Sequence, residues 1–479
     1  MDCILIDTET LPTLETLGRP DVFEFSNQNR NDDVLVTGLG LVTPLGCSAR
    51  ETWEAVMNGQ RAGRSLTCVE IDHFDHLSAM PGLALHGAAM DYAAVSMRLE
   101  RSKLLETVPS KLSGPWRSEP MVAMSLVAFA EAMSHAGLRC RDLKPERTAI
   151  VFGSSKGGLR STERMVEALA TRHTRKPQMA TVGTDDDAEE RMSQPVIQIH
   201  DESEDLWNWG VQPDSAMRAI TALTGSTVAS SCPIAACATG LIALLQGAAM
   251  IHRGECDVCI VGSADAGLRA SVLASFHRLR VTSRHWDAAT ACRPFDKSRD
   301  GFVVGEGAGV AVLESRAHAS SRRARSIAKI LAGGWLNDPT GMTQVDESGA
   351  VVSEILKRTV TFNGRRPDVL SLHGTGTESN DLAEARGIQM AFGANMPQCF
   401  GIKGAIGHLL GAAGSVEAVL TLLALQHQQI PGTTNLTCVD ERCRIPLQPD
   451  ARKMPQMQLA AKLSLGFGGH VACGLFERG

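Results

Sequence analysis

The feature that most constrains the fold is a repeated unit: an apolar run, a turn rich in Gly, Ser or Thr, then a helix. Apolar runs of this kind end in such turns at 34–40 (VLVTGLG), 148–158 (TAIVFGSSKGG), 256–267 (CDVCIVGSADAG) and 368–377 (DVLSLHGTGT). Strands that alternate with helices indicate an α/β fold with a largely parallel or mixed sheet. Ligands in such folds bind beyond the carboxyl ends of the strands, so the polar residues of these turns are the candidate site residues.

The length of the chain predicts more than one structural unit. A chain of 479 residues exceeds a single compact core and favours two to three domains or one duplicated domain. Two strand–turn–helix series, 34–265 and 307–479, indicate two halves. Residues 1–33 are polar and acidic and predict an N-terminal extension, either a disordered tail or a docked arm. Residues 172–215 are rich in acidic side chains and lack periodicity, which predicts a long surface loop or insertion.

Composition narrows the class of protein. A net charge of −6 argues against nucleic-acid binding, which requires a basic surface. The 13 cysteines have no framework spacing and the N-terminus lacks a signal-peptide pattern, so free thiols in a reducing cytoplasm are expected. The longer apolar runs, LIALLQGAAMI and AVLTLLAL, are shorter than the roughly 20 residues that span a bilayer. We therefore expect no membrane span.

The segment SSCPIAACATG at 230–240 raises the question of what its two cysteines do. The pattern predicts a strand over 225–236 and a helix that ends at Gly254, which places Cys237 at the turn between them. Unpaired N–H groups and the dipole at a helix N-terminus favour a thiolate and lower its pKa, and the same N–H groups can bind an oxyanion. Cys232 lies upstream without that advantage. From position alone, Cys237 is equally compatible with a nucleophile and with a small core residue.

A zinc site is the second possibility for these cysteines. Cys232 and Cys237 have x4 spacing, and a Cys256-x2-Cys259 pair follows. Cys256 and Cys259, however, lie in a strand-like apolar run without a Gly-rich knuckle between them. The pattern therefore disfavours zinc, and we expect no metal site.

Two histidines and an acid–base pair lie near other strand ends. His373 ends a strand and precedes a Gly-Thr-Gly-Thr loop, and His408 lies near the predicted start of a helix that is apolar almost all round. A lone His is more often a core residue, but a buried Lys normally pairs with an acid. Lys403 and Glu417 form a plausible pair of this kind. Together with Cys237, these residues suggest acyl-thiol chemistry.

The same residues lie in segments that resemble a known family. AACATG, CRPFDKSRDGFVVGEGAGVAVLE, HGTGTESND, GIKGAIGHLLGAAGSVEA and LGFGGHVA resemble, in order, the signature segments of β-ketoacyl-[acyl-carrier-protein] synthases, above all the elongating type II enzymes. The resemblance covers roughly residues 34–479, except about 172–215. It implies a thiolase-like fold, in which two duplicated βαβαβ-type halves (34–295 and 296–479) form a five-layer αβαβα sandwich. It also implies a homodimer.

The resemblance further implies an activity: decarboxylative Claisen condensation of an acyl thioester with malonyl-acyl carrier protein. Cys237 matches the nucleophile, and His373 and His408 match the pair that contacts the malonyl thioester carbonyl. Lys403 and Glu417 match a supporting ion pair. No cofactor is implied, because the substrates are carried on the phosphopantetheine of acyl carrier protein.

Further residues acquire roles through the same resemblance. Phe467 matches a gate of the acyl pocket and, with Cys237, a backbone donor of the oxyanion hole. Thr375 and Thr377 match residues that bind the phosphopantetheine arm. Asp338 matches a supporting residue, although the family's neighbouring His is replaced by Gly341.

Some departures from the family pattern bear on the partner protein. They also favour a specialised lipid or polyketide pathway slightly over primary fatty-acid synthesis. His470 replaces the small polar residue that the family usually has after the Gly-Gly turn, and the segment 172–215 is unlike its family counterpart. A basic patch for the acidic acyl carrier protein is expected near 98–117, but its residues are rearranged. They are Arg98, Arg101, Lys103, Lys111 and Arg117.

Two other functions compete with condensation. A non-catalytic partner of the chain-length-factor type typically lacks the nucleophilic Cys, whereas Cys237 is retained. A degradative thiolase needs a second Cys near the C-terminus, for which Cys473, in a probable core strand, is the only candidate. The Cys/His/His pattern favours condensation over both.

Overall fold

The computed structural model describes residues 23–25, 33–67, 74–106, 108, 110–174, 206–360 and 365–479. Its main sheet has ten strands, nine of which follow one another in the order β11-β10-β14-β15-β9-β2-β8-β6-β5. These strands are β2 (Val34–Val42), β5 (Thr148–Gly153), β6 (Val258–Asp265), β8 (Gly307–Ser315), β9 (Ala328–Asn337), β10 (Val369–Ser371), β11 (Gln398–Phe400), β14 (Leu459–Gly466) and β15 (His470–Arg478). The principal helices are α1 (Ala49–Met57), α3 (Tyr92–Ser102), α4 (Ser110–Ser118), α5 (Pro120–Ala136), α6 (Leu159–Thr174), α8 (Ser215–Thr224), α9 (Thr239–His252), α10 (Ala270–Arg278), α12 (Arg316–Ser321), α13 (Ala350–Val360), α14 (Glu378–Phe392), α15 (Lys403–Ile406) and α16 (Ala413–His427).

The sheet consists of the same arrangement twice. In the C-terminal half, β10 runs parallel to β11 and β14, while β15 is antiparallel to both β14 and β9. In the N-terminal half, β5 runs parallel to β6 and makes a single parallel bridge with Ser231 on its other side. Strand β8 is antiparallel to both β6 and β2. Pairing of β2 with β9 joins the halves. The structure therefore confirms an α/β fold of two duplicated halves.

The strand pairing also bears on the boundary between the halves, which the sequence placed at residue 295. Strand β8 lies beyond that point, yet it pairs with β2 and β6 of the N-terminal half. We therefore propose that the boundary lies between β8 and β9.

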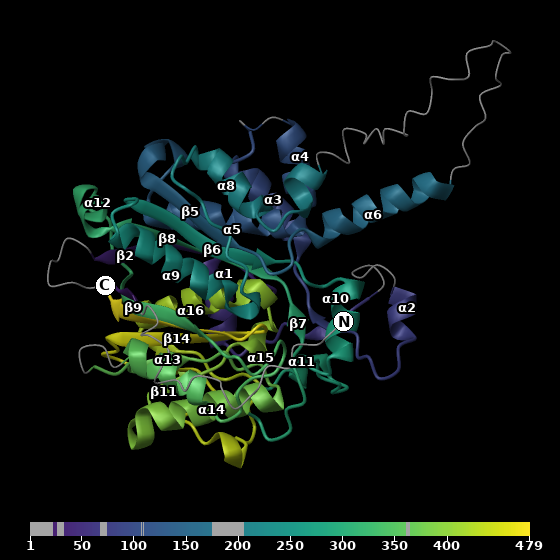
Figure 1. The fold of residues 1–479 in the computed structure, drawn as a ribbon, viewed down its shortest axis with the longest axis vertical. Coiled ribbons are helices and arrows are strands. Elements are labelled where there is room, and N and C mark those ends of the chain that lie inside the picture. The colour runs from purple at the N-terminus through teal and green to yellow at the C-terminus, as the bar shows by residue number, and fades with distance from the viewer. Residues whose placement is uncertain are drawn as a thin grey trace, which may run out of the picture.

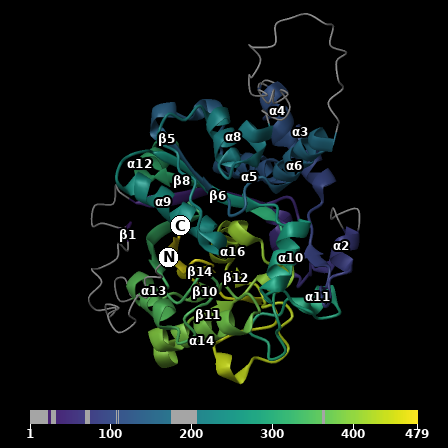
Figure 2. The same ribbon diagram turned by 45° about the vertical axis from the view of Figure 1, so that its right-hand side comes forward.

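Helices and sheet regions alternate in five layers. Helix α5 covers the outer face of the N-terminal half, and α13 and α14 cover that of the C-terminal half (Figures 1 and 2). Helices α9 and α16 pack together between the two sheet regions. The stretch Leu410–His427 is long and apolar enough to cross a membrane, but 89% of it is buried inside the protein. Its apolar character follows from contact with protein on all sides.

Several local predictions are confirmed and one is wrong. Strands β2 and β5 form at 34–40 and within 148–158, as predicted. The strand predicted over 225–236 is wrong, because the segment makes only the bridge at Ser231. His408 lies two residues before the 3-10 turn Leu410–Ala412 that leads into α16, so it lies near the start of a buried helix, as predicted. Gly407, with φ of 74°, ends the short helix α15, which is therefore separate from α16.

The two atypical segments are partly described. Phe23 and Glu24 form strand β1, which pairs antiparallel with β9, and Phe25 is fully buried. This part of the N-terminal extension is therefore a docked arm. Within the predicted insertion 172–215, residues 175–205 lie outside the described residues. Residues Trp207–Val211 form a π-helical turn and α8 begins at Ser215, so the end of the insertion is helical rather than a loop.

Candidate active site

The nucleophile candidate lies in a tight turn. Cys237 is the middle residue of a 3-10 turn, Ala236–Ala238, that leads directly into α9. Ala236 adopts φ of 46°, a left-handed conformation that non-glycine residues rarely occupy. Thr239 fixes the turn: its Oγ1 accepts from the Ala235 N–H (2.9 Å) and donates to the Ala236 carbonyl (2.7 Å). The structure thus places Cys237 immediately before a helix.

The end of β14 lies directly against this turn. A Cβ atom on Gly466 would lie 2.6 Å from the Ala235 carbonyl oxygen and 3.1 Å from the Cys237 nitrogen. Only glycine permits this approach. It places Phe467, the next residue, beside the nucleophile turn, where Phe467 lines the same cavity as Cys237.

That cavity, of about 310 Å³, gathers most of the predicted site residues. They are Cys237, Asp338, His373, Thr375, Thr377, His408 and Phe467. Phe276, Phe302 and Leu410 supply apolar lining. Lys403 and Glu417 lie outside the lining, behind His373.

Three reactive side chains converge in the cavity. Cys237, His373 and His408 each offer an S or N atom, and these atoms lie within 4.8 Å of one another. The two imidazole rings meet edge to face with their centroids 5.5 Å apart. Because His373 follows β10 of the C-terminal half and Cys237 belongs to the N-terminal half, the site forms where the two halves meet.

The surroundings of the histidines define their hydrogen-bonding roles. Nδ1 of His373 lies 3.2 Å from Lys403 Nζ, and Nδ1 of His408 accepts from the Leu410 N–H at 3.2 Å. Burial, followed by the charge of Lys403, holds the pKa of both imidazoles well below the usual value. Both rings are therefore neutral, with the hydrogen on Nε2. A pair of neutral N–H donors suits a developing negative charge.

The same arrangement fits a metal ion poorly. Cys237, His373 and His408 are close enough together to be ligands. A metal-binding imidazole, however, normally donates its other N–H to an acceptor, which fixes the tautomer. Here both Nδ1 atoms face donors, which is the opposite requirement. This donor set matches an oxyanion better than a cation.

The predicted ion pair is present and fully buried. Lys403 Nζ lies 2.6 Å from Glu417 Oε1, and it also donates to the His373 carbonyl oxygen. A buried pair of this kind costs desolvation free energy, which the extra hydrogen bonds help to offset. Lys403 therefore contacts both the ring and the backbone of His373.

The environment of the thiol differs from the prediction. Burial raises the pKa of Cys237 to about 11, while Lys403 and then Lys156 oppose that rise. The expected lowering by the helix terminus is therefore wrong for this structure, because desolvation outweighs the nearby positive charge. The thiolate must be stabilised by donors within the cavity.

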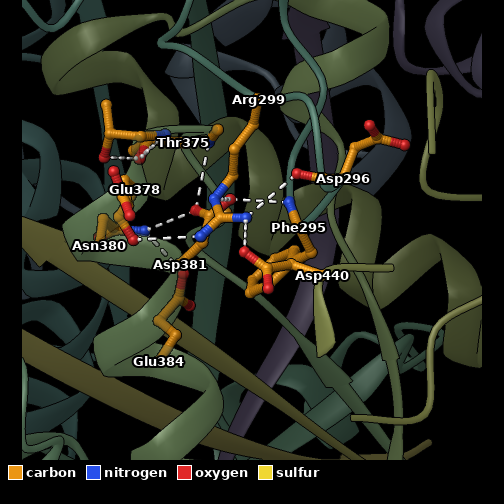
Figure 3. Close-up of polar contacts among 12 residues, drawn as sticks. Phe295, Asp296, Arg299, Thr375, Glu378, Asn380, Asp381, Glu384 and Asp440 are labelled. Atoms are coloured by element: carbon orange, nitrogen blue, oxygen red, sulfur yellow. Dashed lines mark hydrogen bonds and ion pairs between the residues drawn. The ribbon is translucent and has the colours of Figure 1, made fainter. Parts of the chain in front are cut away.

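Sequence reasoning missed the residues that hold the loop after β10 (Figure 3). Glu384 accepts the N–H groups of His373 and Gly374, both at 2.6 Å. Asp381 accepts from the Phe295 N–H at 2.7 Å and pairs with Arg299. The signal was present as acidic residues in HGTGTESNDLAEA, directly after the Gly/Thr turn, where they meet unpaired N–H groups.

The two threonines lie together on the wall of the cavity. The Oγ1 atoms of Thr375 and Thr377 are 2.8 Å apart, and Thr377 is the N-cap residue of α14. A pair of adjacent hydroxyls can donate to and accept from the amides of an extended ligand.

Asp338 has a different role from that of a free acid. Its carboxylate accepts from the Thr340 N–H and hydroxyl and from the Asp346 N–H, so it organises its own loop. At Gly341, a Cβ would lie 2.2 Å from Gln344 Oε1. The Gln344 amide thus fills the space beside Gly341, and His470 lines the cavity nearby.

The predicted basic patch is neutralised in part. Arg98 pairs with Glu51, Lys103 with Glu106 (3.7 Å), and Arg117 with Glu100 (4.0 Å). Arg98 and Arg101 line a separate hollow of about 770 Å³ that shares no lining residue with the Cys237 cavity. The surface around α3 and α4 is therefore of mixed charge.

Comparison with known families identifies the chain. The N-terminal domain of β-ketoacyl synthase matches residues 31–319, and the C-terminal domain of the same family matches residues 328–437. The chain belongs to the β-ketoacyl synthase family. The junction of the two matches falls between β8 and β9. We proposed the boundary between the two halves at the same point from the strand pairing.

Relatives and solved structures agree with this assignment. The chain is 31% identical to 3-oxoacyl-[acyl-carrier-protein] synthase 2 of Vibrio cholerae, over 93% of this chain and 99% of the relative. It is 29% identical to the enzyme of the same name from Mycobacterium bovis, over 93% and 97%. A type II polyketide ketosynthase solved with its acyl-carrier protein has a TM-score of 0.76 at 22% identity, over 93% of this chain and 99% of that one. A β-ketoacyl synthase from Burkholderia phymatum has a TM-score of 0.72 at 24% identity, with the same coverage. The structural likenesses establish the thiolase-like fold.

Proposed function

We propose that this β-ketoacyl synthase is a 3-oxoacyl-[acyl-carrier-protein] synthase. It condenses an acyl thioester with malonyl-acyl carrier protein, and it releases carbon dioxide and 3-oxoacyl-acyl carrier protein. The observation that carries the proposal is the convergence of Cys237, His373 and His408 within 4.8 Å in one cavity. The curated relatives bear this enzyme name over nearly their whole length.

The first step is acyl transfer to the enzyme. Cys237 Sγ attacks the acyl thioester carbonyl, the bond to the phosphopantetheine sulfur breaks, and that thiol leaves with the proton from Cys237. Because burial raises the pKa of the Cys237 thiol to about 11, the nucleophile needs stabilisation as it forms. The Nε2–H groups of His373 and His408 supply it.

The second step is decarboxylation of the malonyl thioester. The bond between the malonyl α-carbon and its carboxylate breaks, carbon dioxide leaves, and the electron pair moves onto the thioester oxygen. Two neutral N–H donors, from His373 and His408, hydrogen-bond this enolate oxygen. A donor placed where charge develops stabilises the transition state more than the ground state.

The third step forms the new carbon–carbon bond. The enolate carbon attacks the carbonyl of acyl-Cys237, and the tetrahedral intermediate collapses to expel the Cys237 thiolate, which takes up a proton from water. The backbone N–H groups of Cys237 and Phe467 hold the oxyanion, a role supported by the close approach of Gly466 to the nucleophile turn. Thr375 and Thr377, which also line the cavity, bind the phosphopantetheine arm.

The two competing functions lack support at the site. A chain-length-factor-like partner would not need Cys237, His373 and His408 in one cavity. A degradative thiolase would need a second cysteine there, whereas Cys473 is fully buried in β15 and does not line the cavity. Condensation accounts for all three reactive groups.

The setting of the enzyme is part of the proposal. Acyl carrier protein delivers both substrates, and no resident cofactor is required by the steps above. We further propose a homodimer in the cytoplasm. Ile234, three residues before Cys237, is 58% exposed, so a partner subunit would bury an apolar side chain beside the nucleophile turn.

The direct test is reconstitution. Purified enzyme is mixed with acyl- and malonyl-loaded acyl carrier protein, and 3-oxoacyl-acyl carrier protein is measured by mass spectrometry. Product formation that depends on both substrates supports the proposal. A purified, folded enzyme that gives neither product nor carbon dioxide contradicts it.

A further inference from the structure

A second buried lysine lies behind the site. Lys462 is on β14, in register with Ser371 at the end of β10, and its side chain has no exposure to solvent. Along β14 it shares a face with Ala460, which packs in the layer of α9 and α16. Burying a charged side chain in the middle of a sheet costs a large desolvation free energy. The contacts that compensate this cost therefore indicate the role of Lys462.

Lys462 shares a carboxylate with Lys403. Its Nζ lies 3.0 Å from Glu417 Oε2, while the other oxygen, Oε1, lies 2.6 Å from Lys403 Nζ. Lys462 also donates to the Leu372 carbonyl at 3.0 Å, and Lys403 donates to the carbonyl of the next residue, His373. One glutamate thus bridges two lysines, each of which holds one of two consecutive carbonyl groups.

A second glutamate holds the same stretch of backbone through its N–H groups. Glu384 accepts from the N–H groups of His373 and Gly374, both at 2.6 Å. Lys462 is a favourable charge for Glu384 as well as for Glu417. The backbone of residues 372–374 is therefore held by two lysines and two glutamates, whose charges sum to zero when both glutamates are ionised.

We propose that Lys462 is a positioning residue for His373. With Lys403, Glu417 and Glu384 it forms a clamp, defined by these four side chains, that fixes the backbone around His373 and hence the direction of its Nε2–H. Lys462 does not touch the substrate; it acts through His373. This inference rests on the proposed function and adds a residue to its machinery.

The clamp has a consequence for pH dependence. Burial raises the pKa of Glu384 to about 7, and Asp381 on the same helix adds to the rise, whereas the two N–H groups and Lys462 oppose it. Cys399 on β11 also faces Glu384. Protonation removes one acceptor oxygen from the clamp, so activity should fall as the pH drops below about 7. Without Lys462 the pKa of Glu384 rises further, and the loss begins at a higher pH.

The variants that test this are Lys462→Met, which removes the charge at similar volume, and Lys462→Arg, which keeps it. Lys329→Met is the matched control, because Lys329 is an ion-paired lysine on β9 (2.6 Å from Asp33 Oδ1) away from the site. We expect K462M to lower kcat for malonyl decarboxylation by about tenfold or more with KM nearly unchanged, as small misplacements of catalytic groups do. The acidic limb of the K462M pH–activity profile should move to higher pH. K462R should recover part of kcat, and K329M should match the wild type in both kcat and pH profile.

Each outcome decides something. A K462M enzyme with wild-type kcat per folded site and an unchanged pH profile, even at lower thermal stability, would overturn the positioning role. If K462M does not fold, Glu384→Gln tests the same clamp. The acidic limb of its pH–activity profile should flatten. An unchanged acidic limb would overturn the clamp. A wild-type enzyme that makes no product would instead overturn the proposed function.

Discussion

The two halves of the molecule contain the same turn, but only one of these turns contains a reactive side chain. In the N-terminal half, Ala236 has φ of 46°, the 3-10 turn Ala236–Ala238 follows, and α9 begins. In the C-terminal half, Leu410 has φ of 53°, the 3-10 turn Leu410–Ala412 follows, and α16 begins. Cys237 and Gly411 occupy equivalent positions. The duplication visible in the sheet therefore extends to the backbone of the active site.

The groups that contact the two turns explain why the turns differ in role. The Gly411 N–H donates to Asp265 Oδ2 at 2.6 Å, so a buried carboxylate occupies the end of this helix. The equivalent Cys237 N–H faces Gly466, which has no side chain, and the cavity. A turn that binds a carboxylate in one half is suited to bind a substrate oxyanion in the other. The C-terminal turn serves the site indirectly, because its Leu410 N–H fixes the tautomer of His408.

The largest expected effect follows removal of the side chain that distinguishes the turns. Cys237→Ala should lower condensation by about 10⁴-fold or more, since loss of a nucleophile removes the covalent route. Cys232→Ala is the matched control, because Cys232 lies in the same segment but outside the cavity lining. Product assays on both variants check this. Equal losses in the two would remove the distinction between the cysteines.

We expect the second-largest effect for His408, which is hydrogen-bonded to the C-terminal turn. His408→Ala should lower malonyl decarboxylation by about 10²–10³-fold, as does the loss of an oxyanion donor. Carbon dioxide release is the measurement. Iodoacetamide labelling of Cys237 should persist in this variant, which shows that the nucleophile turn is intact. Undiminished carbon dioxide release would show that His408 does not stabilise the enolate.

Removing the carboxylate from the structural turn should affect stability more than chemistry. Asp265 accepts from Gly411 and from the hydroxyls of Ser154 and Ser155. Asp265→Asn should lower the free energy of unfolding by about 1.5–3 kcal/mol, the range for hydrogen bonds to charged groups. Urea denaturation gives the value. A variant as stable as the wild type would show that the C-terminal turn needs no bound anion.

Blocking the open side of the Cys237 turn should have a moderate effect on the rate of condensation. Gly466→Ala places a methyl group 2.6 Å from the Ala235 carbonyl and 3.1 Å from the Cys237 nitrogen. The turn must shift, and kcat should fall about 10–100-fold, as for a displacement near 1 Å. Steady-state kinetics provide the test. Unaltered kcat would mean that β14 does not form part of the oxyanion site.

The smallest effect concerns the conformation that both turns share. Ala236→Gly removes a Cβ from a left-handed residue, which offsets the greater flexibility of glycine in the unfolded chain. We expect a gain of about 0.5 kcal/mol in unfolding free energy. Thermal or urea denaturation can resolve it. A clear loss of stability would show that the turn is not strained at Ala236.

Much of the fold was predictable because its signals are local. Apolar runs bounded by Gly and Ser predicted β2, β5 and β6. The strand predicted over 225–236 failed because its pairing is limited to Ser231, which sequence cannot show. The break between α15 and α16 was not predictable, because the apolar composition continues across Gly407.

The candidate site was predictable in part. Cys237, His373, His408, Lys403 and Glu417 stand out because reactive or charged residues are rare in apolar segments. Their roles remain predictions that the geometry supports. The part of Lys462 in the clamp and the contact of Asp265 with the Gly411 N–H were not predictable, because they depend on contacts between distant segments. Lys462 in particular looks like an ordinary polar position of an alternating strand until its register with β10 is known.

The central claim is that Cys237 carries the acyl group while the equivalent Gly411 turn does not react. The most direct measurement is peptide mass spectrometry of the enzyme after incubation with acyl-acyl carrier protein alone, then after addition of malonyl-acyl carrier protein. We expect an acyl adduct on Cys237 that disappears as 3-oxoacyl product forms. An adduct on another residue, or one on Cys237 that malonyl-acyl carrier protein does not discharge, would contradict it.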